Sequence, residues 1–111
     1  MEITFDDFNK IDIRIGTIIE VNDFPKARKP AWQLTIDFGA EIGIKKSSAQ
    51  ITAHYSKEDL VGKQILAVVN FPPKQIANFM SECLVLGVAD ESGDIVLVTT
   101  ERKVGSGERM Q

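Results

Sequence analysis

The sequence predicts an all-β fold: a five- to six-stranded Greek-key barrel with a short N-terminal helix and a helical insertion before the fourth strand. Three observations carry this prediction. Apolar and polar residues alternate with period two in several short segments, as in strands that bury one face. The chain shows no long helical pattern and no internal repeat. One short polar helical segment interrupts the strands between the third and the fourth.

Size and composition favour one domain over residues 1–111, since 43% of the 111 residues are hydrophobic and 26% are charged. The net charge of -3 argues against indiscriminate nucleic-acid binding, which needs many cations to neutralise phosphates. The N-terminus has no basic region followed by an apolar core, so we expect no export signal. No apolar run approaches the roughly 18 residues of a membrane span, so we expect no membrane insertion. The single cysteine, Cys83, cannot form an internal disulfide, which fits a cytoplasmic protein.

The first expected element is a short helix that begins after Thr4 and ends near Lys10. Thr4 followed by Asp7 is an N-cap pattern, because both side chains can bond to free backbone N–H groups at a helix start. Phe5 and Phe8 are three residues apart and share one face of this helix. The sequence leaves two interpretations open: the helix packs on its own barrel, or it helps a partner subunit to dock.

The first strand is expected from Ile11 to Val21, where isoleucines alternate with polar residues. Gly16 within it predicts a bulge or a sharp bend. Such a bend lets one long strand serve both sheets of a small barrel. Phe24 and Pro25 end the strand, and residues 25–30 form a short basic loop flanked by prolines.

The remaining strands are expected at 32–38, 42–46, 65–69, 83–86 and 95–98. Turns are expected at 39–41 and 90–94, a helical turn at 56–60 and a loop at 105–108. This order matches a barrel of the oligonucleotide/oligosaccharide-binding type. An SH3-like barrel is the competing interpretation, and the helical segment between the third and fourth strands favours the former.

Catalysis is not expected from this sequence. It has one histidine, His54, and it lacks a Cys-x-x-Cys pair, a Gly-rich phosphate loop and a His-Glu-x-x-His motif. We therefore expect no catalytic residue, no metal site and no cofactor, and we expect His54 on the surface beside Tyr55.

The best candidate for a functional site is the segment between the fourth and fifth strands. Residues 70–82 are more than the two to five that a hairpin turn needs. Long loops held between rigid strands often carry binding surfaces. If the third strand ends on the same rim of the barrel, its last residues join the site. The candidate binding residues are Lys45, Lys46, Ser47, Ser48, Asn70, Phe71, Lys74, Gln75, Ile76, Asn78, Phe79, Met80, Ser81 and Glu82.

The chemistry of these residues supports more than one ligand. Amides and hydroxyls suit unpaired bases or ribose hydroxyls, and lysines suit phosphates. Exposed Phe and Met side chains beside Ile76 suit an extended apolar peptide equally well. In a third interpretation Ser81 and Glu82 tie down the loop backbone and the lysines are solvated.

Four segments, in order along the chain, resemble the stand-alone tRNA-binding domain family, which includes the C-terminal appendage of bacterial methionyl-tRNA synthetase. These segments are residues 12–16, 34–39, 55–63 and 70–82. Within that family, residues 42–51 and 69–73 are most similar to the CsaA branch of small export-related chaperones.

This resemblance implies a tRNA-binding-type barrel that forms a homodimer through its terminal extensions. It also implies ATP-independent binding of unfolded or presecretory polypeptides and cooperation with the export ATPase SecA. The alternative that it implies is a homodimeric tRNA-binding protein. In that case Lys45, Lys46 and Lys74 would contact phosphates, and Asn70 and Ser81 would contact nucleotides.

Overall fold

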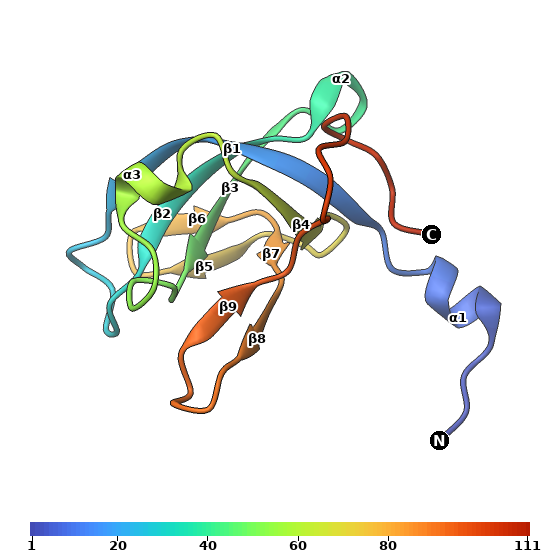
Figure 1. Cartoon of the computed structure of the whole chain (residues 1–111), viewed down its shortest axis with the longest axis horizontal. Helices are drawn as coiled ribbons and strands as arrows, with labels where there is room; N and C mark the ends of the chain where they lie inside the picture. Colours follow the sequence, from blue (N-terminus) through green and yellow to red (C-terminus); the bar gives the residue numbers. More distant parts are fainter.

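A computed structural model describes the whole chain, residues 1–111, and its central feature is a five-stranded antiparallel sheet that curls into a nearly closed barrel (Figure 1). The strand order is β3-β2-β1-β4-β7. These strands are β1 (Ile13–Asp23), β2 (Trp32–Asp37), β3 (Ile44–Ala49), β4 (Gln64–Val68) and β7 (Leu84–Val85). The all-β fold class and the barrel of oligonucleotide-binding type are therefore confirmed.

Two hairpins and three short helices complete the structure. One hairpin joins β5 (Lys74–Ile76) to β6 (Phe79–Ser81), and the other joins β8 (Gly87–Ala89) to β9 (Ile95–Leu97). The helices are α1 (Phe5–Asn9), α2 (Gly39–Ile42) and α3 (Lys57–Leu60). None of them is long and apolar enough to cross a membrane.

Strand β1 serves both sides of the barrel, as predicted. Residues 13–17 of this strand pair with β4, and residues 17–23 pair with β2. Of the two expectations for Gly16, a bulge or a sharp bend, the bulge is wrong, because the irregularity in register lies further along the strand, between Ile18 and Glu20. Gly16 serves close packing instead, since a Cβ atom there would lie 2.5 Å from Ile36 Cγ2 and 2.6 Å from Phe38 Cε1.

The core is built mainly from apolar positions of β1, β2 and β4 and from residues that adjoin these strands. Ile18, Leu34, Ile36 and Phe38 have no exposed surface. The predicted helical turn supplies Leu60, which is fully buried. Its helix α3 begins at a capping box in which Ser56 and Asp59 each bond to the backbone N–H of the other.

The third strand was predicted over 42–46, but β3 begins at Ile44 and continues to Ala49. The reason lies in α2, where the predicted turn is a helical turn that extends to Ile42. The Gly43 N–H donates to the Gly39 carbonyl at 2.7 Å, and both glycines have a positive φ. The candidate residues 45–48 therefore lie within β3 and not after its end.

Two further predictions need correction. Residues 70–82 are not a plain loop, because they contain hairpin β5–β6 with Ala77 and Asn78 at its turn. The fifth strand is shorter than predicted, because β7 covers only Leu84–Val85, and the next residues form β8, which pairs with β9. The tail at 105–108 is a loop, as predicted, and it lies along β1: the Ile15 N–H donates to the Glu108 carbonyl, and the Gly107 N–H donates to the Ile15 carbonyl.

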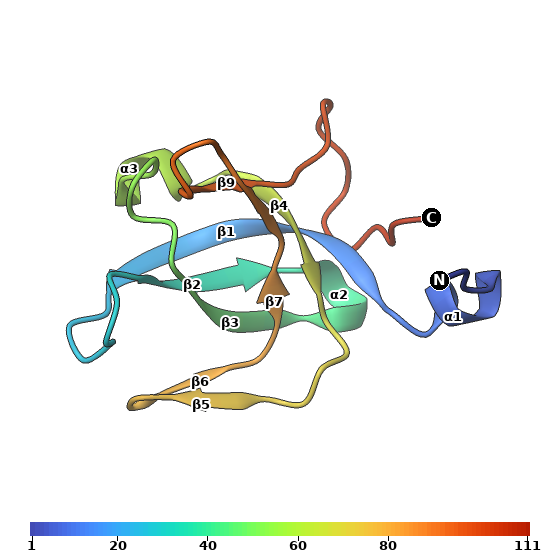
Figure 2. The ribbon, with the colours of Figure 1, turned by 90° about the horizontal axis from the view of Figure 1, so that it is seen from below.

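Helix α1 projects away from the barrel (Figures 1 and 2). Its predicted N-cap is confirmed, since Thr4 and Asp7 form a capping box. None of its residues is buried, and Phe5 is 73% exposed. The interpretation in which this helix packs on its own barrel therefore does not agree with the structure.

Candidate functional site

An open groove of about 700 Å³ lies between hairpin β5–β6 and the outer surface of β3. The segment that leads into the hairpin, Phe71 to Pro73, forms one apolar wall. Ile76 from the hairpin and Leu84 from β7 continue the apolar surface, and Ser48 from β3 contributes a hydroxyl group. The tertiary structure thus brings the two predicted halves of the site together, as expected.

Hairpin β5–β6 is fastened to β3 by polar groups that were predicted to meet a ligand. The Glu82 carboxylate accepts a hydrogen bond from the Lys46 N–H at 2.9 Å, and the Ser81 hydroxyl accepts one from the Ser48 N–H at 3.4 Å. Strand β3 is the edge of the sheet, so these N–H groups would otherwise lack a partner. Ser81 and Glu82 therefore satisfy the sheet edge, in agreement with the interpretation in which they tie down the loop.

Two more predicted residues are also engaged within the protein. Ser47 is 1% exposed and donates from its hydroxyl group to the Cys83 carbonyl at 3.0 Å. Asn70 accepts from the Asp12 N–H at 3.0 Å and donates to the Lys10 carbonyl at 2.8 Å. Ser47 lies beneath the groove surface, and Asn70 joins the start of the hairpin segment to the segment that follows α1.

The four apolar candidates occupy different positions. Phe71 is 53% exposed and lines the groove, where Ile76 lies half-buried. The Phe79 ring packs on the buried Phe24 ring with centroids 5.5 Å apart, so it holds the hairpin against the start of the β1–β2 loop. Met80 is 48% exposed and pairs across the hairpin with Gln75. Because neighbouring residues of a strand point to opposite faces, Met80 faces away from Phe79.

The predicted cations and amides remain near the solvent. Lys46 and Lys74 are exposed, and Lys74 lines the groove. Lys45 is half-buried. Gln75 and Asn78 are exposed on the hairpin, and the Gln75 side chain donates to the Ala77 carbonyl at 3.1 Å. These cations are placed where they could meet an anionic ligand.

A second cleft of about 480 Å³ adjoins the groove and was missed as a candidate site. Lys26, Arg28 and Lys29 of the β1–β2 loop line it, together with the tip of hairpin β5–β6. Ser48 and Ile76 line both the groove and this second cleft, so the groove and the cleft are neighbours. The signal in the sequence was the cluster of three cations without an acidic residue at 25–30. The sequence predicts a basic loop there, but no local pattern connects it to residues 70–82.

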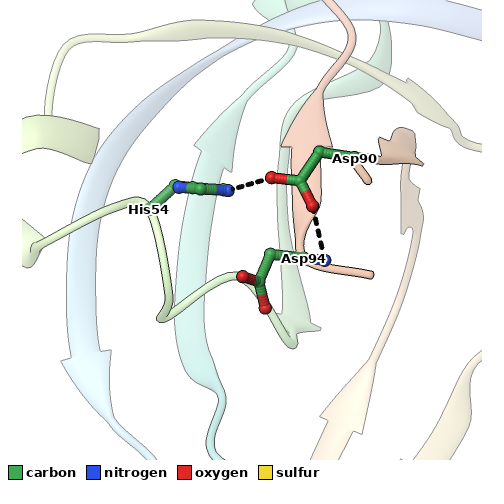
Figure 3. A group of neighbouring side chains, drawn as sticks. All are labelled: His54, Asp90 and Asp94. Atoms are coloured by element: carbon green, nitrogen blue, oxygen red, sulfur yellow. Dashed lines mark hydrogen bonds and ion pairs between the residues drawn. The ribbon is translucent and has the colours of Figure 1, made fainter. Parts of the chain in front are cut away.

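His54 is exposed beside Tyr55, as predicted, and belongs to a cluster with Asp90 and Asp94 (Figure 3). His54 Nε2 lies 2.7 Å from one carboxylate oxygen of Asp90. The other oxygen accepts from the N–H groups of Ser92 and Asp94. These bonds, first among them that from His54, hold the pKa of Asp90 below its ordinary value. The arrangement fastens the β8–β9 turn to the segment before α3, and every Asp90 oxygen already has a partner.

Neither Trp32 nor Tyr55 is free to stack on a ligand. The Trp32 indole N–H donates to the Tyr55 carbonyl at 2.9 Å, and the Tyr55 hydroxyl accepts from the Leu97 N–H at 3.0 Å. Both rings pack against the core. Phe71 is therefore the aromatic side chain of the predicted site that is most accessible to a ligand.

The groove contains no activated nucleophile. Cys83 lines it, but burial raises the pKa of its thiol to about 11. A thiol must lose its proton to act as a nucleophile, so a raised pKa leaves little reactive thiolate near neutral pH. With mostly apolar walls, peripheral cations and polar groups occupied by the backbone, the site is suited to binding.

Comparisons with known proteins agree with this geometry. The family described as "Putative tRNA binding domain" matches residues 13–109. The crystal structure of the CsaA chaperone protein from Picrophilus torridus is 55% identical and superposes with a TM-score of 0.92, covering 99% of this chain and 100% of that chain. The crystal structure of the chaperone CsaA from Bacillus anthracis is 50% identical with a TM-score of 0.92, and both chains are fully covered.

A methionine–tRNA ligase of Bacteroides fragilis is 38% identical over 109 residues. The matched region covers 98% of this chain but only 16% of that ligase. The likeness to the curated ligases therefore concerns a small part of each of those proteins.

Proposed function

Because this chain belongs to the tRNA-binding domain family and is a homologue of the CsaA chaperones, we propose that it is an ATP-independent chaperone that binds unfolded or presecretory polypeptides. The observation that carries the proposal is the exposed apolar groove at Phe71 and Ile76. Apolar surface of this kind is costly to leave in water and marks a place where another molecule binds. The export role, the partnership with SecA and the cytoplasmic location rest on the resemblance and stay predictions.

The geometry defines which residues would contact a bound polypeptide. Phe71 and Ile76 would bury apolar side chains, and Ser48 offers a hydroxyl group at the floor of the groove. Ser81, Glu82 and Asn70 would act indirectly by holding the hairpin in place. This proposal therefore assigns to those three residues a structural role that differs from the ligand contact predicted from the sequence.

Suppression of aggregation tests this function. Light scattering of a chemically denatured client protein is followed after dilution with the wild-type chain or with Phe71→Ala. We expect the variant to lose most of the suppression, because Phe71 provides the largest accessible apolar side chain in the groove. Val61→Ala is the matched control, since Val61 is equally exposed at 53% but lies outside the groove. Equal suppression by all three proteins would remove the groove from the proposal.

A homodimer formed through α1 is also proposed. Ile3 and Phe5 are 64% and 73% exposed. Helix α1 projects from the barrel (Figure 2). Light scattering coupled to size-exclusion chromatography gives the mass in solution. We expect a dimer for the wild-type chain and a monomer for Phe5→Asp, because a charge would have to be buried at the interface. A monomeric wild-type chain would refute this assignment.

Binding of tRNA is the second candidate function, favoured by the family match and by the exposed Lys46 and Lys74. It predicts an affinity that falls steeply with salt concentration, because each phosphate contact releases counterions. Fluorescence anisotropy of labelled bulk tRNA, measured at low and near-physiological salt, tests it. We expect Lys46→Gln with Lys74→Gln to weaken binding and to flatten the salt dependence. A binding constant that does not change with salt would count against tRNA as a ligand.

A further inference from the structure

The basic cleft beside the groove has walls that are held in fixed positions. Phe24, at the start of the β1–β2 loop, is buried and packs on Phe79 of the hairpin, with ring centroids 5.5 Å apart. The Ala27 N–H donates to the Phe24 carbonyl at 3.2 Å, which forms a turn in the loop. Pro25 and Pro30 restrict the backbone on both sides of the cations. Figure 2 shows this loop and the tip of hairpin β5–β6 at the same end of the molecule.

The cations of this cleft are not neutralised by the protein. Lys26, Arg28 and Lys29 are exposed, and none of them takes part in a salt bridge or a side-chain hydrogen bond. No acidic residue lines the cleft. Asp23, the nearest acidic residue along the chain, is paired with Lys57 at 3.0 Å. A chain with a net charge of -3 thus carries a compact positive site next to an apolar groove.

We propose that the basic cleft recognises acidic side chains of the polypeptide that occupies the groove, so that clients with an apolar segment beside an acidic segment are preferred. This inference rests on the proposed chaperone function and names the clients that it selects. Ser48 and Ile76 border both hollows, so one extended chain can pass from one to the other.

An acidic polypeptide agrees with the site better than a nucleic acid does. A nucleic acid needs cations along an extended backbone path, whereas here three cations are concentrated in one loop and Lys74 is the single cation that lines the adjoining groove. Reading bases also needs free amides or hydroxyl groups, yet the Asn70 amide and the Ser81 hydroxyl are occupied by the protein backbone. A short stretch of carboxylates requires neither feature.

The test compares two short fluorescein-labelled peptides by anisotropy. One carries an apolar segment followed by aspartates and glutamates, and the other is identical except for asparagines and glutamines at those positions. Exposed ion pairs contribute little individually, so we expect about tenfold tighter binding of the acidic peptide at low salt and a smaller preference at high salt. A second pair with the segments in reverse order covers the opposite chain direction.

Two variants make the test specific. Lys26→Gln, Arg28→Gln and Lys29→Gln together should bind both peptides with the affinity that the wild-type chain has for the amide peptide. Lys63→Gln, Arg102→Gln and Lys103→Gln together remove the same charge outside the two hollows, and this control should keep the preference. Circular dichroism of both variants checks that they remain folded.

The outcomes separate this inference from the proposed function. If the wild-type chain binds the amide peptide but shows no preference for the acidic one, the inference is wrong and the groove remains a peptide site. If neither peptide binds, both proposals fail. If the cleft variant loses affinity for a labelled RNA oligonucleotide while its preference for the acidic peptide persists, the cleft is a nucleic-acid site and the inference is overturned.

Discussion

Glu82 and Lys46 are joined by two hydrogen bonds: the Glu82 carboxylate accepts from the Lys46 N–H at 2.9 Å, and the Glu82 N–H donates to the Lys46 carbonyl at 2.7 Å. Glu82 thus forms with Lys46 the pair of hydrogen bonds that a neighbouring strand would form, because its side chain supplies the acceptor and its backbone N–H supplies the donor. This pair lies on the edge strand β3 and helps to close the barrel beside the groove.

Removing the carboxylate should loosen the hairpin. Glu82→Ala leaves the Lys46 N–H without its partner, and a hydrogen bond to a charged group contributes about 1.5–3 kcal/mol. Because both residues are partly accessible to water, we expect a loss of about 1–2 kcal/mol in the free energy of unfolding. Urea unfolding measures this loss, and Glu82→Gln, which keeps an acceptor, should lose less. Unchanged hydrogen exchange at Lys46 in the alanine variant would contradict this role.

The Phe24–Phe79 contact should couple the basic loop to the hairpin. A double-mutant cycle with Phe24→Leu and Phe79→Leu isolates the aromatic interaction, for which we expect about 0.5–1.5 kcal/mol. Phe79→Leu should also weaken peptide binding, although the Phe79 ring does not line the groove. Additive effects of the two substitutions on stability would mean that the rings do not support each other.

Gly16 should not tolerate a methyl group. Gly16→Ala would place a Cβ against the fully buried Ile36 and Phe38, which cannot move without disturbing the core. Overpacking of this kind costs about 1–3 kcal/mol. Gly105→Ala is the control, since its nearest atom would be 3.9 Å away and its φ is not in the left-handed region. Thermal unfolding should therefore shift for the first variant and stay near the wild-type value for the second.

Cys83 should react slowly with iodoacetamide in the folded state. Burial raises the pKa of its thiol to about 11 from a model-compound value of 9.0, so little thiolate exists near neutral pH. Between these two values the folded state holds a proton that the unfolded state releases, so this group's contribution to stability falls as pH rises above about 9. Mass spectrometry of alkylated protein checks the rate, and urea should accelerate it. Rapid labelling of folded protein would show that the thiol is accessible.

The bond between His54 and Asp90 should make the β8–β9 turn sensitive to acid. The pKa of Asp90 is lowered below 3.8, so its stabilising contribution is present above that value and is lost as pH falls through the lower pKa of the folded state. We expect Asp90→Ala to lower the melting temperature near neutral pH. The difference from the wild-type chain should shrink toward zero in strong acid, and a difference that stays constant with pH would exclude the carboxylate as its source.

Much of the fold was determined by local patterns in the sequence. Thr4 with Asp7 and Ser56 with Asp59 mark helix starts, because a capping box involves only residues three positions apart. The alternation of apolar residues in β1 and β2 marks the buried faces, because side chains of a strand point alternately to its two sides. The same local reasoning identified residues 70–82 as unusual. Of the fourteen candidate residues, six line the groove: Ser48, Phe71, Lys74, Gln75, Ile76 and Ser81.

What only the tertiary structure decided is which of those side chains remain free. Glu82 meets Lys46 across 36 positions of sequence, and Asn70 meets Lys10 across 60. Whether Phe79 faces a ligand or Phe24, and whether the basic loop borders the groove, likewise depends on segments that are distant in the chain. The physical reason is that a polar or aromatic side chain binds whatever lies opposite to it, and the curvature of the sheet brings those partners together. The sequence by itself determined most of the elements and the candidate region, and the closing of the barrel left Phe71 and the nearby cations accessible to solvent.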